Sequence, residues 1–162
     1  MLVSARTLFL VALLSLAAAC SQSEPGVERA AHYLDLQAVP LYPNETPELR
    51  RQIVSAAVRH DVPVELVQKV VVRESTHRPE ARNGPYFGLM QILPATARSM
   101  GFDGQPKDLL DAETNLEYAV KYLRGAWMVS DGDMDTAVKW YARGYYHEAK
   151  RRGLLEETGL AG

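Results

Sequence analysis

Glu74 is the residue of this sequence whose surroundings most strongly suggest catalysis. The segment over residues 63–75 has helical spacing, and Val67, Val70 and Val71 form its apolar stripe. Glu74 follows these valines by seven, four and three residues, so it lies on the same stripe. An ionised carboxylate among valines is poorly solvated, which raises its pKa. Glu74 is therefore a candidate general acid at neutral pH, and a helix-end glutamate that bends into solvent is the alternative.

The segments that must position Glu74 begin and end with residues typical of helices. Thr46 is a favourable N-cap, and Pro47 occupies the first helical position after it. Asp111 and Asp135 can each cap a further helix, and Gly153 can end the last one. Helices are therefore expected from residue 47, over 62–75, over 94–100, from 112 and over 135–152. No segment alternates apolar and polar residues as a strand does, so the sequence predicts an all-α fold.

Composition and charge exclude several kinds of ligand. The formal net charge of −2 does not suit a nucleic-acid partner, which needs clustered basic charge. The single cysteine cannot form an internal disulfide or a multi-cysteine zinc site, and the four histidines form no tight ligand pair. Asp131-Gly132-Asp133 mimics the start of a calcium loop, but position twelve is Ala142, so a turn and a helix cap are expected. We predict no metal, no cofactor and a monomer.

Residues 1–19 have the pattern of a signal peptide. One arginine precedes an apolar run, which is too short to span a bilayer comfortably and is followed by Ala17-Ala18-Ala19. Cys20 then resembles the lipidated cysteine of bacterial lipoproteins, although that signal prefers Leu at the position of Ala17. Residues 20–45 would form a flexible tether in the periplasm, with the lipid in the outer rather than the inner membrane. Without lipidation at Cys20 the protein would be secreted.

The motifs that follow Glu74 form a specific set. Glu74-Ser75 is followed by Gly88-Leu89-Met90-Gln91, by Pro94-Ala95-Thr96-Ala97, and later by Asn115 and Tyr122-Leu123. This set resembles the soluble-lytic-transglycosylase (SLT) family of the lysozyme-like superfamily, over about residues 48–152. The resemblance implies a small lysozyme-like helical domain over residues 46–153, followed by a tail over residues 154–162.

The resemblance also implies a function. The family cleaves the β-1,4 bond between N-acetylmuramic acid and N-acetylglucosamine in peptidoglycan glycan strands and forms 1,6-anhydro-N-acetylmuramic acid. Glu74 would act first as the acid and then as the base. Ser75 would orient the N-acetyl group of the substrate, and Tyr141 would form a hydrogen bond with Glu74. Met90 and Gln91 would line the cleft.

The sequence departs from the family pattern at two places, and these departures leave alternatives open. Ala142 stands where the family has an Asn that reaches the glycan, and Arg143 follows it, while Tyr86-Phe87 replace the customary Gly-Ala pair. One alternative is a muramidase that uses water, with Glu80 as a second carboxylate, although a solvated Glu80 is the simpler interpretation. Another alternative is a glycan-binding lipoprotein with weak or no turnover.

Overall fold

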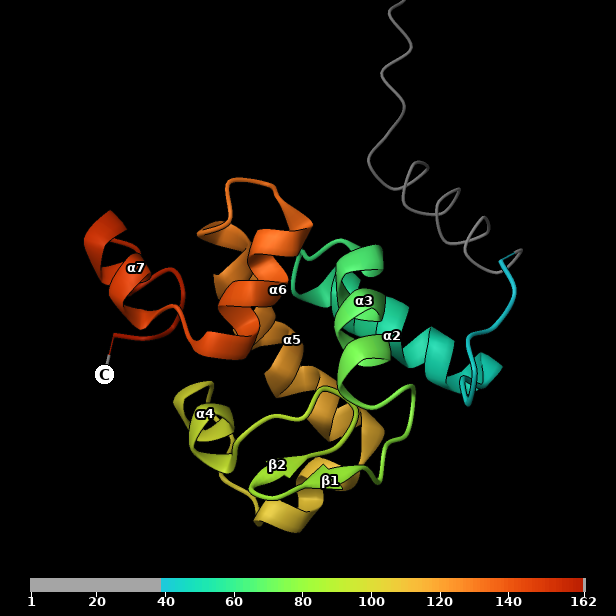
Figure 1. Ribbon diagram of the computed structural model, residues 1–162. Helices are drawn as coiled ribbons and strands as arrows, with labels where there is room; N and C mark the ends of the chain where they lie inside the picture. The colour runs from blue at the N-terminus through green and yellow to red at the C-terminus, as the bar shows by residue number, and fades with distance from the viewer. Residues whose placement is uncertain (1–38, 162) are drawn as a thin grey trace, which may run out of the picture. The chain divides into compact units, whose positions relative to one another are not determined.

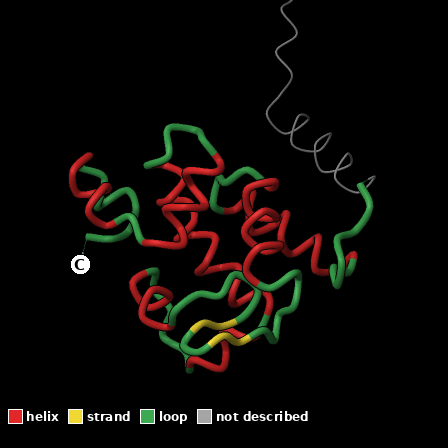
Figure 2. The backbone as a smooth tube through the Cα atoms, in the orientation of Figure 1, coloured by secondary structure: helices red, strands yellow, loops and turns green. Residues whose placement is uncertain are grey.

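The computed structural model describes residues 39–161, which fold mainly into helices (Figure 1, Figure 2). In chain order the elements are α2 (Pro47–Arg59), α3 (Val64–Glu74), β1 (Arg82–Asn83), β2 (Tyr86–Phe87), α4 (Pro94–Ser99), the 3-10 helix η1 (Pro106–Leu110), α5 (Ala112–Met128), α6 (Met134–Arg143) and α7 (Tyr146–Arg152). The prediction of an all-α fold is confirmed. The expected signal peptide, Cys20 and most of the expected tether lie outside the described residues.

α5 is the helix around which the others pack. It contacts α2, α4, α6 and η1, and it runs through the middle of Figure 1. Its side chains at Leu116, Ala119, Val120 and Leu123 are buried, as their helical spacing predicts. Burying a leucine or valine side chain contributes about 1.5–3 kcal/mol, so this stripe holds the surrounding helices together. Trp127, four residues after Leu123 on the same helix, is half-buried.

Two helices start at the side-chain caps that the sequence predicts. Thr46 Oγ1 accepts a hydrogen bond from the Leu49 amide at 3.1 Å, with Pro47 in the first helical turn. Asp111 Oδ1 accepts one from the Thr114 amide at 2.8 Å. Each cap satisfies an amide that has no partner within its own helix, and this is why α2 and α5 begin where they do.

The single helix expected over residues 135–152 is two helices in the structure. The N-cap of α6 is Asp133, whose carboxylate accepts a hydrogen bond from the amide three residues later at 2.7 Å, and not Asp135. Gly144 then adopts φ +85° and ψ 146°, a backbone conformation that residues other than glycine rarely adopt. α6 therefore ends there. Gly153 ends α7 in the left-handed conformation, as predicted. The prediction of one helix over residues 135–152 is therefore wrong, because Gly144 interrupts it.

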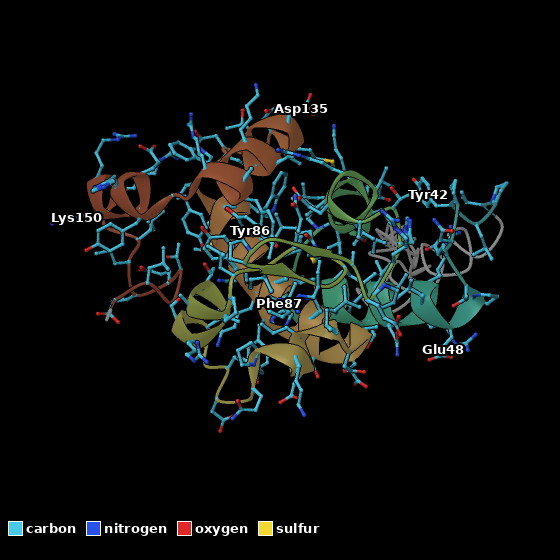
Figure 3. The ribbon with its side chains drawn as sticks, turned by 60° about the horizontal axis from the view of Figure 1, so that its bottom comes forward. Tyr42, Glu48, Tyr86, Phe87, Asp135 and Lys150 are labelled. Atoms are coloured by element: carbon cyan, nitrogen blue, oxygen red, sulfur yellow. The ribbon has the colours of Figure 1, made fainter. Side chains whose placement is uncertain are left out.

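β1 and β2 form a short antiparallel hairpin that the sequence does not reveal. Arg82 pairs with Phe87, and Asn83 pairs with Tyr86. Figure 3 labels Tyr86 and Phe87, the two residues of β2. The chain then turns back, and Phe87 and Ile92 exchange backbone hydrogen bonds at 3.1 Å. Strands of two residues are too short to show an alternating pattern. The hairpin forms one wall of the cleft described below.

Both ends of the described chain belong to the folded domain. Arg50 donates hydrogen bonds to the carbonyl oxygens of Val39 and Pro40, at 2.7 and 3.1 Å, so the last residues of the expected tether lie against α2. In the expected tail, Thr158 is buried. The domain is therefore longer at both ends than residues 46–153. None of the helices in this described part of the chain is long and apolar enough to cross a membrane.

Candidate active site

A cleft of about 580 Å³ opens beside the C-terminal end of α3. Its walls come from the end of α3, the β1–β2 hairpin, the segment leading into α4 and the end of α6. Segments that are distant in the sequence therefore meet at this place. Three of the residues expected from the sequence line the cleft, namely Glu74, Gln91 and Tyr141.

Glu74 is the last residue of α3, and its side chain is partly buried. Its side chain is 21% exposed. Burial raises the pKa of its carboxyl group, and the guanidinium group of Arg73, with Nε 3.4 Å from Oε1, offsets part of this rise. Among the described residues that line the cleft, Glu74 is the only carboxylate. This is the environment that a general acid needs near neutral pH.

Tyr141 lines the same cleft, but its hydroxyl group donates elsewhere. The ring is buried, and Oη donates a hydrogen bond to the carbonyl oxygen of Met90 at 2.8 Å. The expected hydrogen bond between Tyr141 and Glu74 is therefore replaced by one to the backbone. Burial raises the pKa of Tyr141 well above its ordinary value, and the charge on Glu74 raises it further. Tyr141 thus remains a neutral donor that ties α6 to the loop at Met90.

The loop that follows β2 is held against α5 by one buried side chain. Asn115 Oδ1 accepts a hydrogen bond from the Met90 amide at 2.9 Å, and its Nδ2 donates to the carbonyl oxygens of Phe87 and Leu109 at 2.9 and 2.8 Å. Gly88, with φ +74°, packs so closely on Asn115 that a Cβ atom there would overlap the amide group. The Gly-Leu-Met-Gln motif and Asn115 are therefore parts of one structural unit.

The other residues expected to contact substrate differ in their exposure. Gln91 lines the cleft, and its Nε2 donates to the carbonyl oxygens of Ala81 and Gly88 at 3.0 and 2.9 Å, which leaves Oε1 for a ligand. Met90 is fully buried, so it belongs to the core and not to the cleft floor. Ser75 is buried as well, with its hydroxyl group bonded to backbone groups. Ser75 and Met90 therefore support the cleft from the core and do not line it.

Sequence reasoning missed several residues that line the cleft. Arg73 and Tyr86 line it from α3 and the hairpin, and Arg143 lines it from α6, next to Ala142. The guanidinium carbon of Arg143 lies 3.8 Å from the centre of the Trp140 ring. The departures from the family pattern at Tyr86 and Ala142 are the sequence signal that points to these walls, because both positions lie on them.

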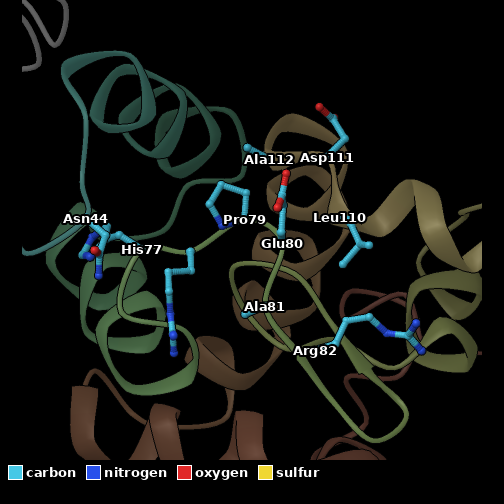
Figure 4. Close-up of a pocket in the computed structure, with 10 residues that line it drawn as sticks. Asn44, His77, Pro79, Glu80, Ala81, Arg82, Leu110, Asp111 and Ala112 are labelled. Atoms are coloured by element: carbon cyan, nitrogen blue, oxygen red, sulfur yellow. The ribbon is translucent and has the colours of Figure 1, made fainter.

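Glu80 is not among the residues that line this cleft. It is exposed and lines a separate pocket of about 680 Å³ together with His77, Arg82 and Asp111 (Figure 4). The described part of the chain therefore supplies no second carboxylate to the cleft, and the interpretation of Glu80 as a solvated side chain agrees with its position.

The acidic run that begins at Asp131 is a turn and a helix cap, as the sequence predicts. Asp133 caps α6, and Asp131 pairs with Arg152, whose Nη1 lies 2.6 Å from Oδ1. Within residues 39–161, no group of three or more His, Cys, Asp or Glu side chains is arranged to hold a metal ion. The run therefore serves the fold.

A comparison with known proteins identifies the family of the chain. The sequence model of the transglycosylase SLT domain matches residues 51–156, which include Glu74, the loop after β2 and the end of α6. No solved structure matches the chain. Members of this family are lytic transglycosylases of the lysozyme-like superfamily and act on peptidoglycan. Because the match covers more than half of the sequence, the chain belongs to the transglycosylase SLT domain family.

Proposed function

We propose that this protein cleaves the β-1,4 bond between N-acetylmuramic acid and N-acetylglucosamine in peptidoglycan, and that the product is 1,6-anhydro-N-acetylmuramic acid. The observation that carries the proposal is Glu74 in its cleft. It is partly buried, its pKa is raised by burial, and no second carboxylate lines the cleft among the described residues. A single carboxyl group suits a reaction in which one residue acts as both acid and base.

The first step breaks the glycosidic bond. The neutral carboxyl group of Glu74 donates its proton to the glycosidic oxygen, and the bond between that oxygen and the anomeric carbon of N-acetylmuramic acid breaks. The carbonyl oxygen of the substrate's own N-acetyl group forms a bond to the anomeric carbon. Such assistance replaces the second carboxylate that most glycoside hydrolases use.

The second step closes the anhydro ring. The Glu74 carboxylate accepts the proton of the C6 hydroxyl group, and that oxygen forms a bond to the anomeric carbon as the N-acetyl oxygen leaves. No water is consumed, and Glu74 ends the cycle protonated, as it began. The raised pKa favours this return to the neutral form.

The surrounding residues would support these steps in different ways. Oε1 of Gln91 can accept a hydrogen bond from a sugar amide, because Nε2 is already used to hold the loop. Tyr141 would position the cleft wall through its hydrogen bond to Met90. Ser75, buried directly after Glu74, would hold the turn that ends α3.

The test is product analysis with a matched pair of variants. Mass spectrometry of the soluble fragments should show anhydro sugars from the wild-type protein. Glu74→Gln should lower turnover by about 10²–10⁴-fold, because the proton donor is lost, while the helical circular dichroism and the binding to sacculi are retained. Glu80→Gln, which removes an exposed carboxylate outside the cleft, should leave turnover unchanged.

Each other result points to a different function. Fragments with reducing ends would identify a muramidase that uses water. Binding to sacculi without cleavage would identify a glycan-binding protein with weak or no turnover, the alternative raised by Ala142 in place of the family Asn in the cleft wall. Unchanged turnover of Glu74→Gln would contradict the assignment of Glu74.

We also propose that the protein is anchored in the periplasm by lipid on Cys20, the only cysteine of the sequence. The support is the run Ala17-Ala18-Ala19 directly before it. Several acyl chains anchor a protein firmly, since each buried CH₂ contributes about 0.8 kcal/mol. Labelling with a radioactive fatty acid should mark the wild-type protein, and Cys20→Ala should be unlabelled and appear in the soluble fraction. An unlabelled wild-type protein would contradict the anchor.

A further inference from the structure

Arg143 is a cation at the edge of the cleft that has no acidic partner among the described residues. It is exposed at the end of α6, and its guanidinium group lies over the Trp140 ring at 3.8 Å. Stacking on an aromatic ring fixes the plane of a guanidinium group and leaves its N–H groups at the edge free to donate. Many arginines of the described chain instead pair with carboxylates, among them Arg50, Arg51, Arg59, Arg151 and Arg152.

Arg73 is a second cation that lines the same cleft. Its side chain is 50% exposed, and Nε lies 3.4 Å from Glu74 Oε1, which is an ion-pair distance longer than a good hydrogen bond. The guanidinium group of Arg73 can therefore turn to a stronger partner when one enters the cleft.

The charge of the cleft suits an anionic strand. Arg73 and Arg143 contribute two positive charges, and Glu74 is neutral when it donates its proton. A strand that contains muramic acid carries carboxylates next to every bond of the cleaved type. The lactyl carboxylate is free where no peptide is attached. Where a stem peptide is attached, the carboxylates of that peptide supply the negative charge instead. A strand of N-acetylglucosamine alone has none.

We propose that Arg143, with Arg73, binds a carboxylate that the glycan strand carries beside the bond to be cleaved. These two arginines then make the cleft bind muramic-acid strands more tightly than neutral strands. The side chain of Ala142 contributes no hydrogen bond to this selection. This inference rests on the proposed function, because it requires a glycan strand in the cleft.

The test measures binding without turnover. Full-length protein with Glu74→Gln is titrated with three strands of equal length: one with free lactyl carboxylates, one with stem peptides, and one in which the lactyl carboxylates are converted to neutral methylamides. The carboxylate strand should bind about tenfold more tightly than the methylamide strand, as one charge-assisted pair provides. This difference should shrink between 50 mM and 500 mM salt, because salt screens exposed charges.

Arg143 variants in the Glu74→Gln background show where the carboxylate binds. Adding Arg143→Gln should remove the tenfold difference and leave the affinity for the methylamide strand unchanged. Arg143→Lys should keep part of the difference, since it keeps the charge and loses the planar stacking. The matched control is Arg82→Gln, because Arg82 also stacks on an aromatic ring, Phe87 at 4.4 Å, but lines the separate pocket. It should bind all three strands as the parent does.

The outcomes separate the two carboxylate sources and the two proposals. Loss of affinity confined to free-lactyl strands assigns the lactyl group, and loss confined to peptide-bearing strands assigns the stem. Equal weakening of the methylamide strand by Arg143→Gln, or absence of binding to every strand, overturns the inference. The protein could bind charged strands more tightly than neutral ones and yet yield no anhydro product. That result would support the inference and contradict the proposed function.

Discussion

At the scale of single residues, the position of Glu74 at the end of α3 explains how one carboxyl group can serve as acid and base. The apolar stripe of α3 removes water from one side of the carboxyl group and raises its pKa, while the cleft keeps the other side accessible to a ligand. Arg73 stabilises the ionised form that must follow proton donation. A glutamate deeper in the helix would be neutral but inaccessible, and one beyond the helix would be accessible but ionised.

Glu74→Gln should therefore change how stability depends on pH. The raised pKa means that the folded protein holds a proton that the unfolded chain releases, so wild-type stability falls as pH rises from the unfolded value, about 4.3, through the raised folded value. The glutamine variant should match the wild type below about pH 4 and exceed it at pH 7. Urea unfolding at both pH values measures this, and a constant difference at the two pH values would contradict it.

Gly88→Ala tests the close contact in the loop after β2. The residue has φ +74°, and a Cβ atom would overlap the buried amide of Asn115. We expect a loss of about 3 kcal/mol or more, since strain and overlap act together. Gly132→Ala is the control: its φ of +81° also disfavours alanine, but nothing lies within 4 Å, so about 1 kcal/mol is expected. Equal losses in the two variants would show that strain alone decides.

At the scale of elements, α5 positions the cleft although its own side chains contribute little to it. Asn115 on α5 bonds the amide of Met90 and the carbonyl oxygen of Phe87, and Tyr141 on α6 bonds the carbonyl oxygen of Met90. The loop between the hairpin and α4 is thus held from two helices. These hydrogen bonds restrict the backbone conformation of the loop, in which Gln91 adopts φ +49°.

Asn115→Leu should weaken this arrangement, because it keeps the branched shape of the side chain and removes its polar atoms. The Met90 amide and the Leu109 carbonyl oxygen lose their partners, whereas the Phe87 carbonyl oxygen keeps the Ile92 amide. An unsatisfied buried group costs about 1–3 kcal/mol, so a loss of about 2 kcal/mol or more is expected. Hydrogen exchange of the Met90 amide should also become faster. Asn83→Ala, which removes an exposed amide in the hairpin, should stay within about 0.5 kcal/mol of the wild type. Unchanged exchange at Met90 would show that the loop is held by other contacts.

At the scale of the whole domain, a buried ion pair holds residues 39–45 against the helices. Both oxygens of Glu45 accept hydrogen bonds: Oε1 from Arg50 Nε at 3.0 Å and Gln68 Nε2 at 2.7 Å, and Oε2 from Arg50 Nη2 at 2.5 Å and the Tyr42 amide at 2.9 Å. Burial alone would raise the pKa of Glu45, but these hydrogen bonds outweigh burial and hold the pKa below its ordinary value. Glu45 thereby joins the first described segment to α2 and α3.

Glu45→Gln should remove the buried carboxylate that pairs with Arg50 and cost about 3–5 kcal/mol at pH 7. The stabilisation is present above the unfolded pKa and is lost as pH falls through the lowered folded pKa, so wild type and variant should converge in acid. Chemical unfolding at pH 7 and pH 3 measures both effects. Glu48→Gln, in an exposed pair with Arg51, should cost less than about 1 kcal/mol. A loss that is equal at both pH values would contradict a role for the Glu45 charge.

The sequence by itself determined the fold class, the starts of several helices and the main candidate residue. The all-α class, the starts of α2, α4 and α5 and the place of Glu74 on an apolar stripe all follow from interactions within four residues along the chain, such as capping and helical spacing. Such local patterns can be read from one segment at a time.

Only the tertiary structure decided which side chains line the cleft. Ser75 and Met90 share motifs with Glu74 and Gln91, yet they are buried, while Arg143 on another helix lines the cleft. The partner of Tyr141 is a backbone carbonyl group that no side-chain pattern records. A cleft is the space left between packed elements, so its lining depends on how distant segments meet, and spacing within any one of them does not contain that information.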